Sequence, residues 1–236
     1  MTSPSHPADP GSVRELFETI APRYDLLNDL LSLGLHRVWK RQAAAWLRPG
    51  PGQHLLDLCC GTGDLALVLA SRVRPGGMVV GLDAAEAPLA IARRRSERLP
   101  WLPIRWCQGD ALATGLDSAS LDGVVMAYGL RNLPDPAAAL QELRRLVRPG
   151  GRVAVLDFNR PDDESMEHLQ RAYLRRVVVP AARCFHVADS YAYIETSLGR
   201  FPRAAWQEAL ARAAGFSSAH HRPLAGGLMG LLELVA

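Results

Sequence analysis

Residues 55–64 read Leu-Leu-Asp-Leu-Cys-Cys-Gly-Thr-Gly-Asp, and this stretch decides the fold. The apolar run His54–Leu58 predicts a buried strand, and Gly61 and Gly63 predict a tight turn into a helix that begins near residue 65. Glycine lets the backbone bend sharply at such a turn and lets a ligand approach without a Cβ in the way. The stretch therefore indicates a strand, a loop and a helix with a ligand site beside them.

A second acid marks the end of the next predicted strand. Asp83 follows the apolar run of residues 78–82 and lies 20 residues beyond Gly63. A carboxylate at this place can accept hydrogen bonds from both hydroxyls of a ribose. The glycine loop and Asp83 together predict a ligand that contains a nucleoside.

Two nucleoside cofactors fit this pattern. Gly61, Gly63 and Ala66 satisfy the dinucleotide pattern G-x-G-x-x-G/A, so an NAD(P)-dependent oxidoreductase is one interpretation. Two features favour S-adenosylmethionine (AdoMet) instead. Asp57 has no standard role in the dinucleotide fingerprint, and Asp64 would place a negative charge where a pyrophosphate would bind. A cationic sulfonium tolerates acidic surroundings better, and a glycine turn without any ligand is the remaining alternative.

Strands and helices alternate regularly after the glycine loop. Further apolar runs predict strands at 78–82, 104–108, 123–127 and 152–157. Helical patterns lie between them at 65–73, 84–98 and 136–147. The alternation predicts an α/β fold with a doubly wound, mostly parallel sheet covered on both faces. Runs at 219–223 and 228–235 predict an antiparallel hairpin that closes one edge of that sheet.

Length and composition indicate a single domain. The chain has 236 residues, of which 48% are hydrophobic, enough for a sizeable core. We expect a loose tail at 1–11 and one domain at 12–236, with a helical cap (12–50), a cofactor-binding core (51–160) and substrate-side helices with the hairpin (161–236). The net charge of +3 is small and gives no reason to expect nucleic acid as a partner.

Two further patterns bear on location and metal binding. We expect a soluble protein without a secretory signal or a membrane span, because no apolar run reaches about 18 residues. The four cysteines form no C-x-x-C pair and have no zinc spacing, so we expect no metal site and a reducing cytoplasm.

Several segments resemble one known family in the same order along the chain. Residues 57–64 resemble motif I of the class I AdoMet-dependent methyltransferases. More specific segments resemble the ubiquinone/menaquinone-biosynthesis C-methyltransferases: 24–29 (YDLLND), 36–40 (HRVWK), 128–132 (YGLRN), 149–151 (PGG), 190–193 (SYAY) and 200–202 (RFP). Segments that look most like the cyanobacterial and plastid branch are 59–60 (CC), 156–159 (LDFN), 177–180 (VVVP) and 226–230 (GGLMG). Members of that branch methylate demethylphylloquinone.

The resemblance implies AdoMet as methyl donor and a set of cofactor-binding residues: Tyr24, Asp57, Gly61, Thr62, Gly63, Asp83, Asp110 and Ala111. Asp83 would bind the ribose hydroxyls, and Asp110 with Ala111 would contact the adenine. Tyr24 would close over the methionine end. Ala127 departs from the family pattern, since many members have serine there, and we leave it out of the site.

The resemblance also implies a substrate, a prenylated naphthoquinol that receives its ring methyl group. Arg131 is the predicted catalytic residue, because a fixed cation beside a ring hydroxyl lowers the pKa of that hydroxyl. It lies where the strand 123–127 ends, and ligands of parallel sheets bind at such ends. Asn132, Tyr193 and Ser197 are predicted to orient the substrate. An arginine cannot take the proton itself, so a water or a nearby His or Asp side chain must do so.

Three questions of partner and class stay open on the sequence. We predict transient contact with a membrane surface, such as the thylakoid, through residues 26–35 and 173–185, because a phytyl-bearing substrate lies in a bilayer. The sequence also leaves open whether the chain forms a homo-oligomer. The alternatives in function are a demethylmenaquinone or benzoquinol methyltransferase, an NAD(P)-dependent oxidoreductase, and a non-catalytic protein with an AdoMet-binding fold.

Overall fold

The computed structural model describes residues 11, 18, 32, 34–161, 163–173, 175–176, 180 and 197–236. Two of the predicted site residues, Tyr24 and Tyr193, lie outside the described residues. Most residues of the two segments predicted to contact a membrane, 26–35 and 173–185, also lie outside the described residues.

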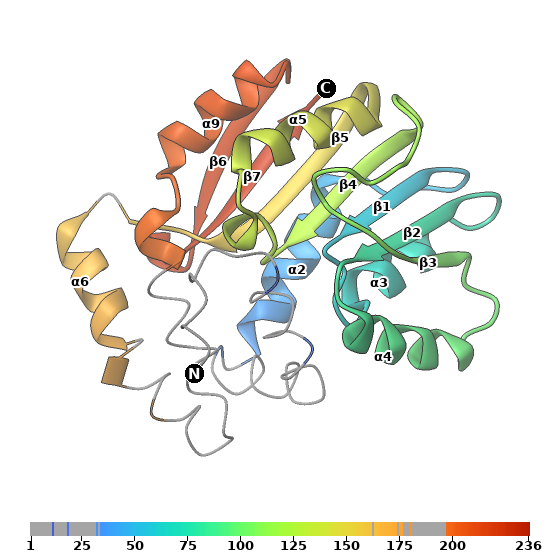
Figure 1. The fold of residues 1–236 in the computed structure, drawn as a ribbon, viewed down its shortest axis with the longest axis horizontal. Helices are drawn as coiled ribbons and strands as arrows, with labels where there is room; N and C mark the ends of the chain where they lie inside the picture. Colours follow the sequence, from blue (N-terminus) through green and yellow to red (C-terminus); the bar gives the residue numbers. More distant parts are fainter. Residues whose placement is uncertain are drawn as a thin grey trace.

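In the described part of the chain, seven strands form one sheet in the order β3-β2-β1-β4-β5-β7-β6 (Figure 1). The strands are β1 (His54–Leu58), β2 (Met78–Asp83), β3 (Ile104–Gln108), β4 (Leu121–Ala127), β5 (Val147–Phe158), β6 (Ser218–Leu224) and β7 (Met229–Val235). The first five strands pair in parallel, whereas β7 pairs antiparallel with both β5 and β6. The predicted parallel sheet closed by a C-terminal hairpin is confirmed.

Helices cover both faces of the sheet. The described helices are α2 (Leu35–Trp46), α3 (Asp64–Arg72), α4 (Glu86–Glu97), α5 (Pro136–Leu146), α6 (Glu164–Tyr173) and α9 (Ala204–Ala213), with 3-10 turns η1 (Leu130–Asn132) and η3 (Ala225–Gly227). Of these, α6 lies apart from the sheet at the edge of the molecule (Figure 1). Val124 and Met126 of β4 pack with α5 and α9, whereas Val125 packs with α2 and α3. This alternation follows from the pleat of the strand, which points successive side chains to opposite faces. Figure 1 shows α5 and α9 together over the β5–β7–β6 half.

The register of the central strands sets the position of the site. Leu58, the last residue of β1, pairs with Leu82 of β2 and with Met126 of β4. The three strands therefore end at one level. The residues that follow them meet at the carboxyl edge of the sheet, where ligands of such sheets bind.

One boundary differs from the expectation. The helical pattern was expected to stop at residues 149–151 and a strand to begin after them, but β5 runs from Val147 through these residues. Gly150 takes a left-handed conformation with φ 77°. Its N–H donates to the carbonyl of Ala236 (3.0 Å), and the N–H of Ala236 donates to the carbonyl of Gly151 (2.9 Å). The C-terminus thus holds the Pro-Gly-Gly segment in the sheet through contacts distant in sequence.

No helix within the described ranges combines the length and the hydrophobicity that crossing a bilayer requires.

Candidate functional site

A cavity of about 700 Å³ lies at the carboxyl ends of the central strands. Its wall contains six of the predicted cofactor residues: Asp57, Gly61, Thr62, Asp83, Asp110 and Ala111. Asn132, one of the predicted substrate residues, also lines it. The structure therefore brings together residues from the ends of β1, β2 and β3 and from the turn after β4, as the sequence pattern predicted.

Asp57 joins the end of β1 to the start of α3. Its side chain is buried, and its Oδ2 accepts a hydrogen bond from the N–H of Ala66 (2.8 Å). Burial raises the pKa of Asp57 to about 7, against the lowering effects of that hydrogen bond and of the Lys40 ammonium. The carboxyl therefore changes charge near neutral pH, at a place where a cationic ligand would favour the charged form.

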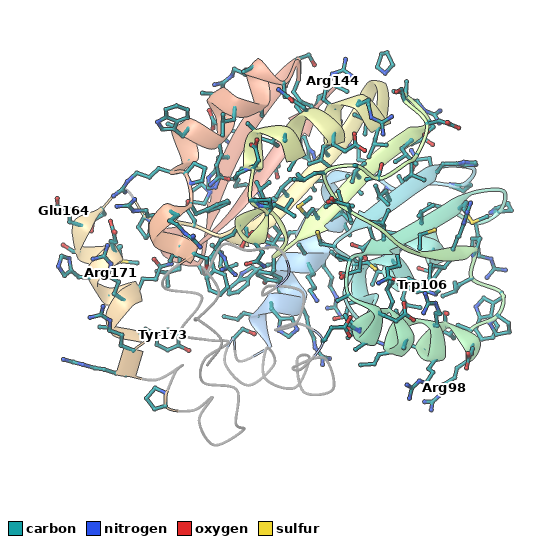
Figure 2. All side chains as sticks on the ribbon, in the orientation of Figure 1. Arg98, Trp106, Arg144, Glu164, Arg171 and Tyr173 are labelled. Atoms are coloured by element: carbon teal, nitrogen blue, oxygen red, sulfur yellow. The ribbon has the colours of Figure 1, made fainter. Side chains whose placement is uncertain are left out.

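The two glycines of the loop serve different purposes. Gly61 has φ 54° and lines the cavity, and a Cβ built on it would meet no atom within 4 Å. Gly63 has φ 84° and is not part of the cavity wall, and its Cβ would lie 2.4 Å from the ring of Trp106. Figure 2 places Trp106 on β3, beside α4. Gly61 thus opens the wall to a ligand, whereas Gly63 makes room for an aromatic ring.

Asp83 holds the glycine loop from the end of β2. Its Oδ2 accepts from the N–H of Gly61 (2.8 Å), and its Oδ1 accepts from the N–H of Ala85 (2.9 Å). Burial raises the pKa of Asp83, and these backbone hydrogen bonds oppose that rise. A carboxylate has about four lone-pair sites, so both oxygens can also accept from ligand hydroxyls.

The charge of Asp64 is balanced by two cations. Lys40 Nζ lies 3.0 Å from its Oδ2, and an Arg95 nitrogen lies 2.6 Å from its Oδ1. Burial alone would raise the pKa of Asp64, but the two cations lower it. The sequence argument that Asp64 repels a pyrophosphate is therefore weakened, because this carboxylate is not an unbalanced charge. Lys40 lines the cavity and was not among the predicted site residues, although it is the only lysine of the chain.

Strained backbone occurs at the ends of β1 and β4. Cys59 (φ 57°) and Tyr128 (φ 62°) both have left-handed conformations and both line the cavity. A Cβ on Gly129 would lie 2.8 Å from the Cβ of Cys59, so the two strand ends are in close contact. Non-glycine residues in this conformation concentrate at ligand sites, where the surrounding structure enforces them.

Arg131 lies in η1, beside the cavity wall and not in it. Its backbone N–H and its Nε donate to the two carboxylate oxygens of Asp157, at 3.0 and 3.3 Å. Its Nη1 donates to Ser197 Oγ, and its guanidinium lies 5.3 Å from the centre of the Phe158 ring. The side chains of Arg131 and Asp157 are 5% and 4% exposed. Burial raises the pKa of Asp157, and Arg131 opposes that rise.

Of the other residues predicted to orient the substrate, Ser197 lies beside Arg131 and Asn132 lies in the cavity wall. Ser197 is buried and contacts Arg131, whereas the described cavity wall does not include it. Asn132 Nδ2 donates to the carbonyl of Tyr128 (2.8 Å), and its buried Oδ1 has no hydrogen-bond partner. Asn132 thus lies in the cavity wall, next to Arg131 in the chain.

The wall fits AdoMet in size and charge. A volume of about 700 Å³ is in the range of small-molecule sites. Of the described residues in the wall, Asp57, Asp83 and Asp110 are acidic and Lys40 alone is basic. Acids suit a ligand that carries a sulfonium and an ammonium group, and Asp83 has lone pairs for ribose hydroxyls.

Comparisons with known proteins agree with this geometry. The model of the ubiE/COQ5 methyltransferase family matches residues 6–232. The chain is 50% identical over 220 residues to the 2-phytyl-1,4-naphtoquinone methyltransferase of Thermosynechococcus vestitus, covering 93% of this chain and 97% of the relative. It is 43% identical over 222 residues to the chloroplastic 2-phytyl-1,4-beta-naphthoquinone methyltransferase of Arabidopsis thaliana, covering 93% and 85%.

Solved structures show the same fold at low sequence identity. A putative methyltransferase of Haloferax volcanii, solved with the Trm112 activator, aligns with a TM-score of 0.69, 18% identity and coverage of 95% and 97%. A SAM-dependent methyltransferase of Aquifex aeolicus aligns with a TM-score of 0.60, 16% identity and coverage of 96% and 98%. The chain has the class I AdoMet-methyltransferase fold, belongs to the ubiE/COQ5 methyltransferase family and is an AdoMet-dependent methyltransferase.

Proposed function

We propose that this enzyme adds the ring methyl group to a prenylated naphthoquinol, with the reduced form of 2-phytyl-1,4-naphthoquinone (demethylphylloquinol) as substrate. The observation that carries the proposal is the likeness to relatives named for this quinone, at 43–50% identity over nine-tenths of the chain. The proposed product is phylloquinol. A demethylmenaquinol or a ubiquinone-pathway benzoquinol is the second candidate, because the sequence resembles the ubiquinone/menaquinone-biosynthesis C-methyltransferases as a group.

The cofactor half of the cavity is proposed to hold AdoMet through Asp83, the glycine loop and the end of β3. Asp83 accepts hydrogen bonds from the ribose hydroxyls, and Asp110 and Ala111 contact the adenine. Gly61 and Thr62 form the wall beside the methionine part. Gly63 supports the loop by accommodating Trp106, as its geometry suggests. When bound, AdoMet supplies an electrophilic methyl group on its sulfonium sulfur.

The substrate half is proposed to activate the quinol through Arg131. An isolated aromatic hydroxyl has a pKa of about 10, and a cation within about 4–6 Å lowers such a pKa by about 1–3 units. Nε and Nη1 of Arg131 are bonded to Asp157 and Ser197. Nη2 remains to donate a hydrogen bond to the ring oxygen. This contact stabilises the anion that forms when the hydroxyl proton leaves, and the anion makes the adjacent ring carbon nucleophilic.

Asp157 is proposed to position Arg131. Its oxygens accept from Arg131 and from the N–H of Phe158 (2.8 Å), so the carboxylate is engaged on both sides. A neutral side chain in its place would let the guanidinium turn away from the ring oxygen. No histidine is among the described residues of the cavity wall, and we propose that water takes the hydroxyl proton. After methyl transfer, with S-adenosylhomocysteine as the leaving group, the methylated ring carbon would lose its own proton to water and the ring oxygen would regain one, which restores the aromatic quinol.

Asn132, Ser197 and Tyr193 are proposed to orient the substrate. Asn132 is the member of this set for which the support is strongest, because it lines the cavity and its buried Oδ1 has no partner. Such an acceptor is costly to leave unsatisfied and can take the hydrogen of a quinol hydroxyl. Ser197 acts through its contact with Arg131.

Contact with a bilayer is proposed at α6 and the start of α2. Leu169 and Tyr173 of α6 are 57% and 42% exposed, and Leu35 and Val38 of α2 are 48% and 44% exposed. Figure 2 shows Tyr173 and Arg171 on α6, at the edge of the molecule. Exposed apolar side chains with neighbouring arginine favour a membrane surface. Flotation with anionic liposomes tests this: association supports the proposal, and none, with or without substrate, removes it.

The ring preference tests the function. The kcat/KM of methyl transfer is compared for reduced 2-phytyl-1,4-naphthoquinone and for a reduced polyprenyl benzoquinone of equal tail length. We expect the naphthoquinol to be preferred. Preference for the benzoquinol would keep the family and discard this substrate. AdoMet binding without transfer to either ring would discard both proposed substrates.

A further inference from the structure

The cavity wall contains an aromatic side chain that the proposed binding of AdoMet leaves without a role. Among the described residues that line the cavity, Tyr128 alone carries an aromatic ring. It directly follows Ala127, the last residue of β4. The proposed ribose and adenine contacts, Asp83 and Asp110, lie at the ends of β2 and β3, and β1 separates these two strands from β4. Tyr128 therefore belongs to the end of the cavity that lies away from the proposed nucleoside contacts.

The backbone fixes the direction in which the Tyr128 side chain leaves the strand. Tyr128 has φ 62°, a left-handed conformation that residues other than glycine rarely adopt. Its N–H donates to the carbonyl of Leu156 in β5 (2.7 Å), and its own carbonyl accepts from Asn132 Nδ2 (2.8 Å). Both backbone polar groups of Tyr128 are thus engaged. The surrounding structure enforces the strained conformation, as is common at ligand sites.

The ring of Tyr128 also connects the cavity to the predicted catalytic cation. It packs against the ring of Phe158, with the ring centres 6.0 Å apart and the ring planes at 55°. The guanidinium of Arg131 lies 5.3 Å from the centre of the same Phe158 ring. Neither Phe158 nor Arg131 is among the described residues of the wall, so Tyr128 is the member of this group that faces the cavity. A ring bound against Tyr128 would lie beside the group that holds Arg131.

We propose that Tyr128 packs against the ring system of the quinol and favours a fused two-ring substrate over a single ring. The inference rests on the function proposed above, because it takes a quinol as the occupant of this end of the cavity. Aromatic pairs in offset-stacked or tilted contact gain stability beyond the apolar area that they bury. The reacting ring must face the methyl donor. The second ring of a naphthoquinol is therefore the part that Tyr128 can select, and a benzoquinol lacks it.

Methyl-transfer kinetics with two quinols that carry the same tail test this selection. We compare kcat/KM for reduced 2-phytyl-1,4-naphthoquinone and for reduced 2-phytyl-1,4-benzoquinone, and we measure AdoMet affinity by calorimetry. Tyr128→Leu removes the ring and keeps an apolar side chain. We expect it to lower kcat/KM about 5- to 20-fold for the naphthoquinol, mainly through KM, and less than about 3-fold for the benzoquinol. AdoMet affinity should stay within about 2-fold, because other residues form the proposed nucleoside contacts.

Two further variants separate the effect of the Tyr128 ring from that of its surroundings. Tyr128→Phe keeps the ring and should keep the wild-type ratio of the two kcat/KM values. Phe158→Leu is the matched control, because it removes a ring that contacts Tyr128 and Arg131 but does not line the described cavity wall. It should lower both kcat/KM values by a similar factor, since the backbone of Tyr128 is held independently. An equal loss for both quinols in Tyr128→Leu, or a matching loss of AdoMet affinity, would overturn the proposal.

A second measurement does not depend on turnover. The chain has five tyrosines, so labelling with 3-fluorotyrosine gives five ¹⁹F resonances, and the one missing in Tyr128→Phe belongs to Tyr128. We expect this resonance to shift when 2-phytyl-1,4-naphthoquinone is added to the enzyme saturated with S-adenosylhomocysteine. An unchanged resonance, while calorimetry shows that the quinone binds, would overturn the role of Tyr128 and leave the proposed function intact. No binding of the quinone and no transfer to its reduced form would overturn the proposed substrate, and this inference with it.

Discussion

The proposed cofactor half and the proposed substrate half of the site are built in different ways. In the proposed cofactor half, aspartate side chains accept hydrogen bonds from backbone N–H groups: Asp83 from Gly61, 22 residues away, and Asp57 from Ala66, 9 residues away. In the proposed substrate half, the Arg131 side chain itself is held, by Asp157, 26 residues away, and by Ser197, 66 residues away. The comparison indicates that the first half fixes the backbone of the glycine loop, whereas the second fixes the side chain of Arg131.

The largest effect is expected in the substrate half. Arg131→Met should lower kcat by about 100- to 1000-fold, because it removes the cation proposed to stabilise the developing quinol anion. AdoMet affinity, measured by calorimetry, should stay within about 2-fold, since the described contacts of Arg131 are to Asp157, Ser197 and Phe158.

Arg131→Lys is the companion variant, because it keeps a charge beside the buried Asp157 and so protects the fold. It should lower kcat by about 10-fold, since an ammonium lacks the planar fork of a guanidinium. A fall in AdoMet affinity that matched the fall in kcat would show that Arg131 also acts on the cofactor, and would contradict the separate roles of the two halves.

The next effect concerns stability and separates the two loop glycines. Gly63→Ala should lower the free energy of unfolding by about 3 kcal/mol, because the new Cβ meets the Trp106 ring and the left-handed backbone disfavours alanine. Gly61→Ala should cost about 1 kcal/mol, since nothing occupies the space of its Cβ, yet it should weaken AdoMet binding. Denaturant unfolding and calorimetry measure the two effects. The same stability loss in both variants would contradict the separate roles.

Asp83 tests the cofactor half directly. Asp83→Asn should raise the dissociation constant of AdoMet by about 50- to 100-fold, because it replaces a charged acceptor of two hydroxyls and disturbs the hydrogen bond to Gly61. The KM for the quinol should change little. Unchanged AdoMet binding would place the ribose elsewhere.

Asp57 is predicted to make the stability of the cofactor half depend on pH. Its pKa is about 7 in the folded chain, whereas an aspartate in an unfolded chain has a pKa of about 3.9. The folded state therefore binds the Asp57 proton more tightly than the unfolded state does. The protonated carboxyl contributes fully to the free energy of unfolding below about pH 4, and this contribution is lost as the pH rises toward 7 and above.

Asp57→Asn removes this loss, because an amide does not titrate. The free energy of unfolding of the variant, relative to the wild type, should rise by about 2 kcal/mol between pH 5 and pH 7. Denaturant titrations of both proteins without ligand measure it. A difference that stayed constant with pH would show that Asp57 keeps an ordinary pKa.

The smallest effect is expected at Ser197. Ser197→Ala removes one hydrogen bond to Arg131 and should lower kcat by about 5-fold, with AdoMet affinity unchanged. Ser197→Thr, which keeps the hydroxyl, is the control and should recover part of the loss. An effect as large as that of Arg131→Met would indicate that Ser197 contacts the substrate itself.

Most of the fold could be predicted from sequence because its signals are local. The apolar runs of β1 and β3 predicted their bounds as observed, and the glycine turn located the cavity. The β5 boundary was wrong because the pairing of Gly150 with Ala236 comes from the far end of the chain. The ion pair of Lys40 with Asp64 joins residues 24 apart on two helices, and no pattern of spacing indicates it. The burial of Arg131 against Asp157 and Ser197 was unpredictable for the same reason.

The most direct test of the central claim is methyl transfer from radiolabelled AdoMet to 2-phytyl-1,4-naphthoquinone, measured with and without a reductant. The account predicts that label appears in the methylated quinone only when the reductant is present, because only the quinol has a hydroxyl whose deprotonation activates the ring carbon. Equal transfer without the reductant would contradict the proposed activation of the quinol by Arg131. No transfer to the reduced quinone, from an enzyme that binds AdoMet, would contradict the proposed substrate.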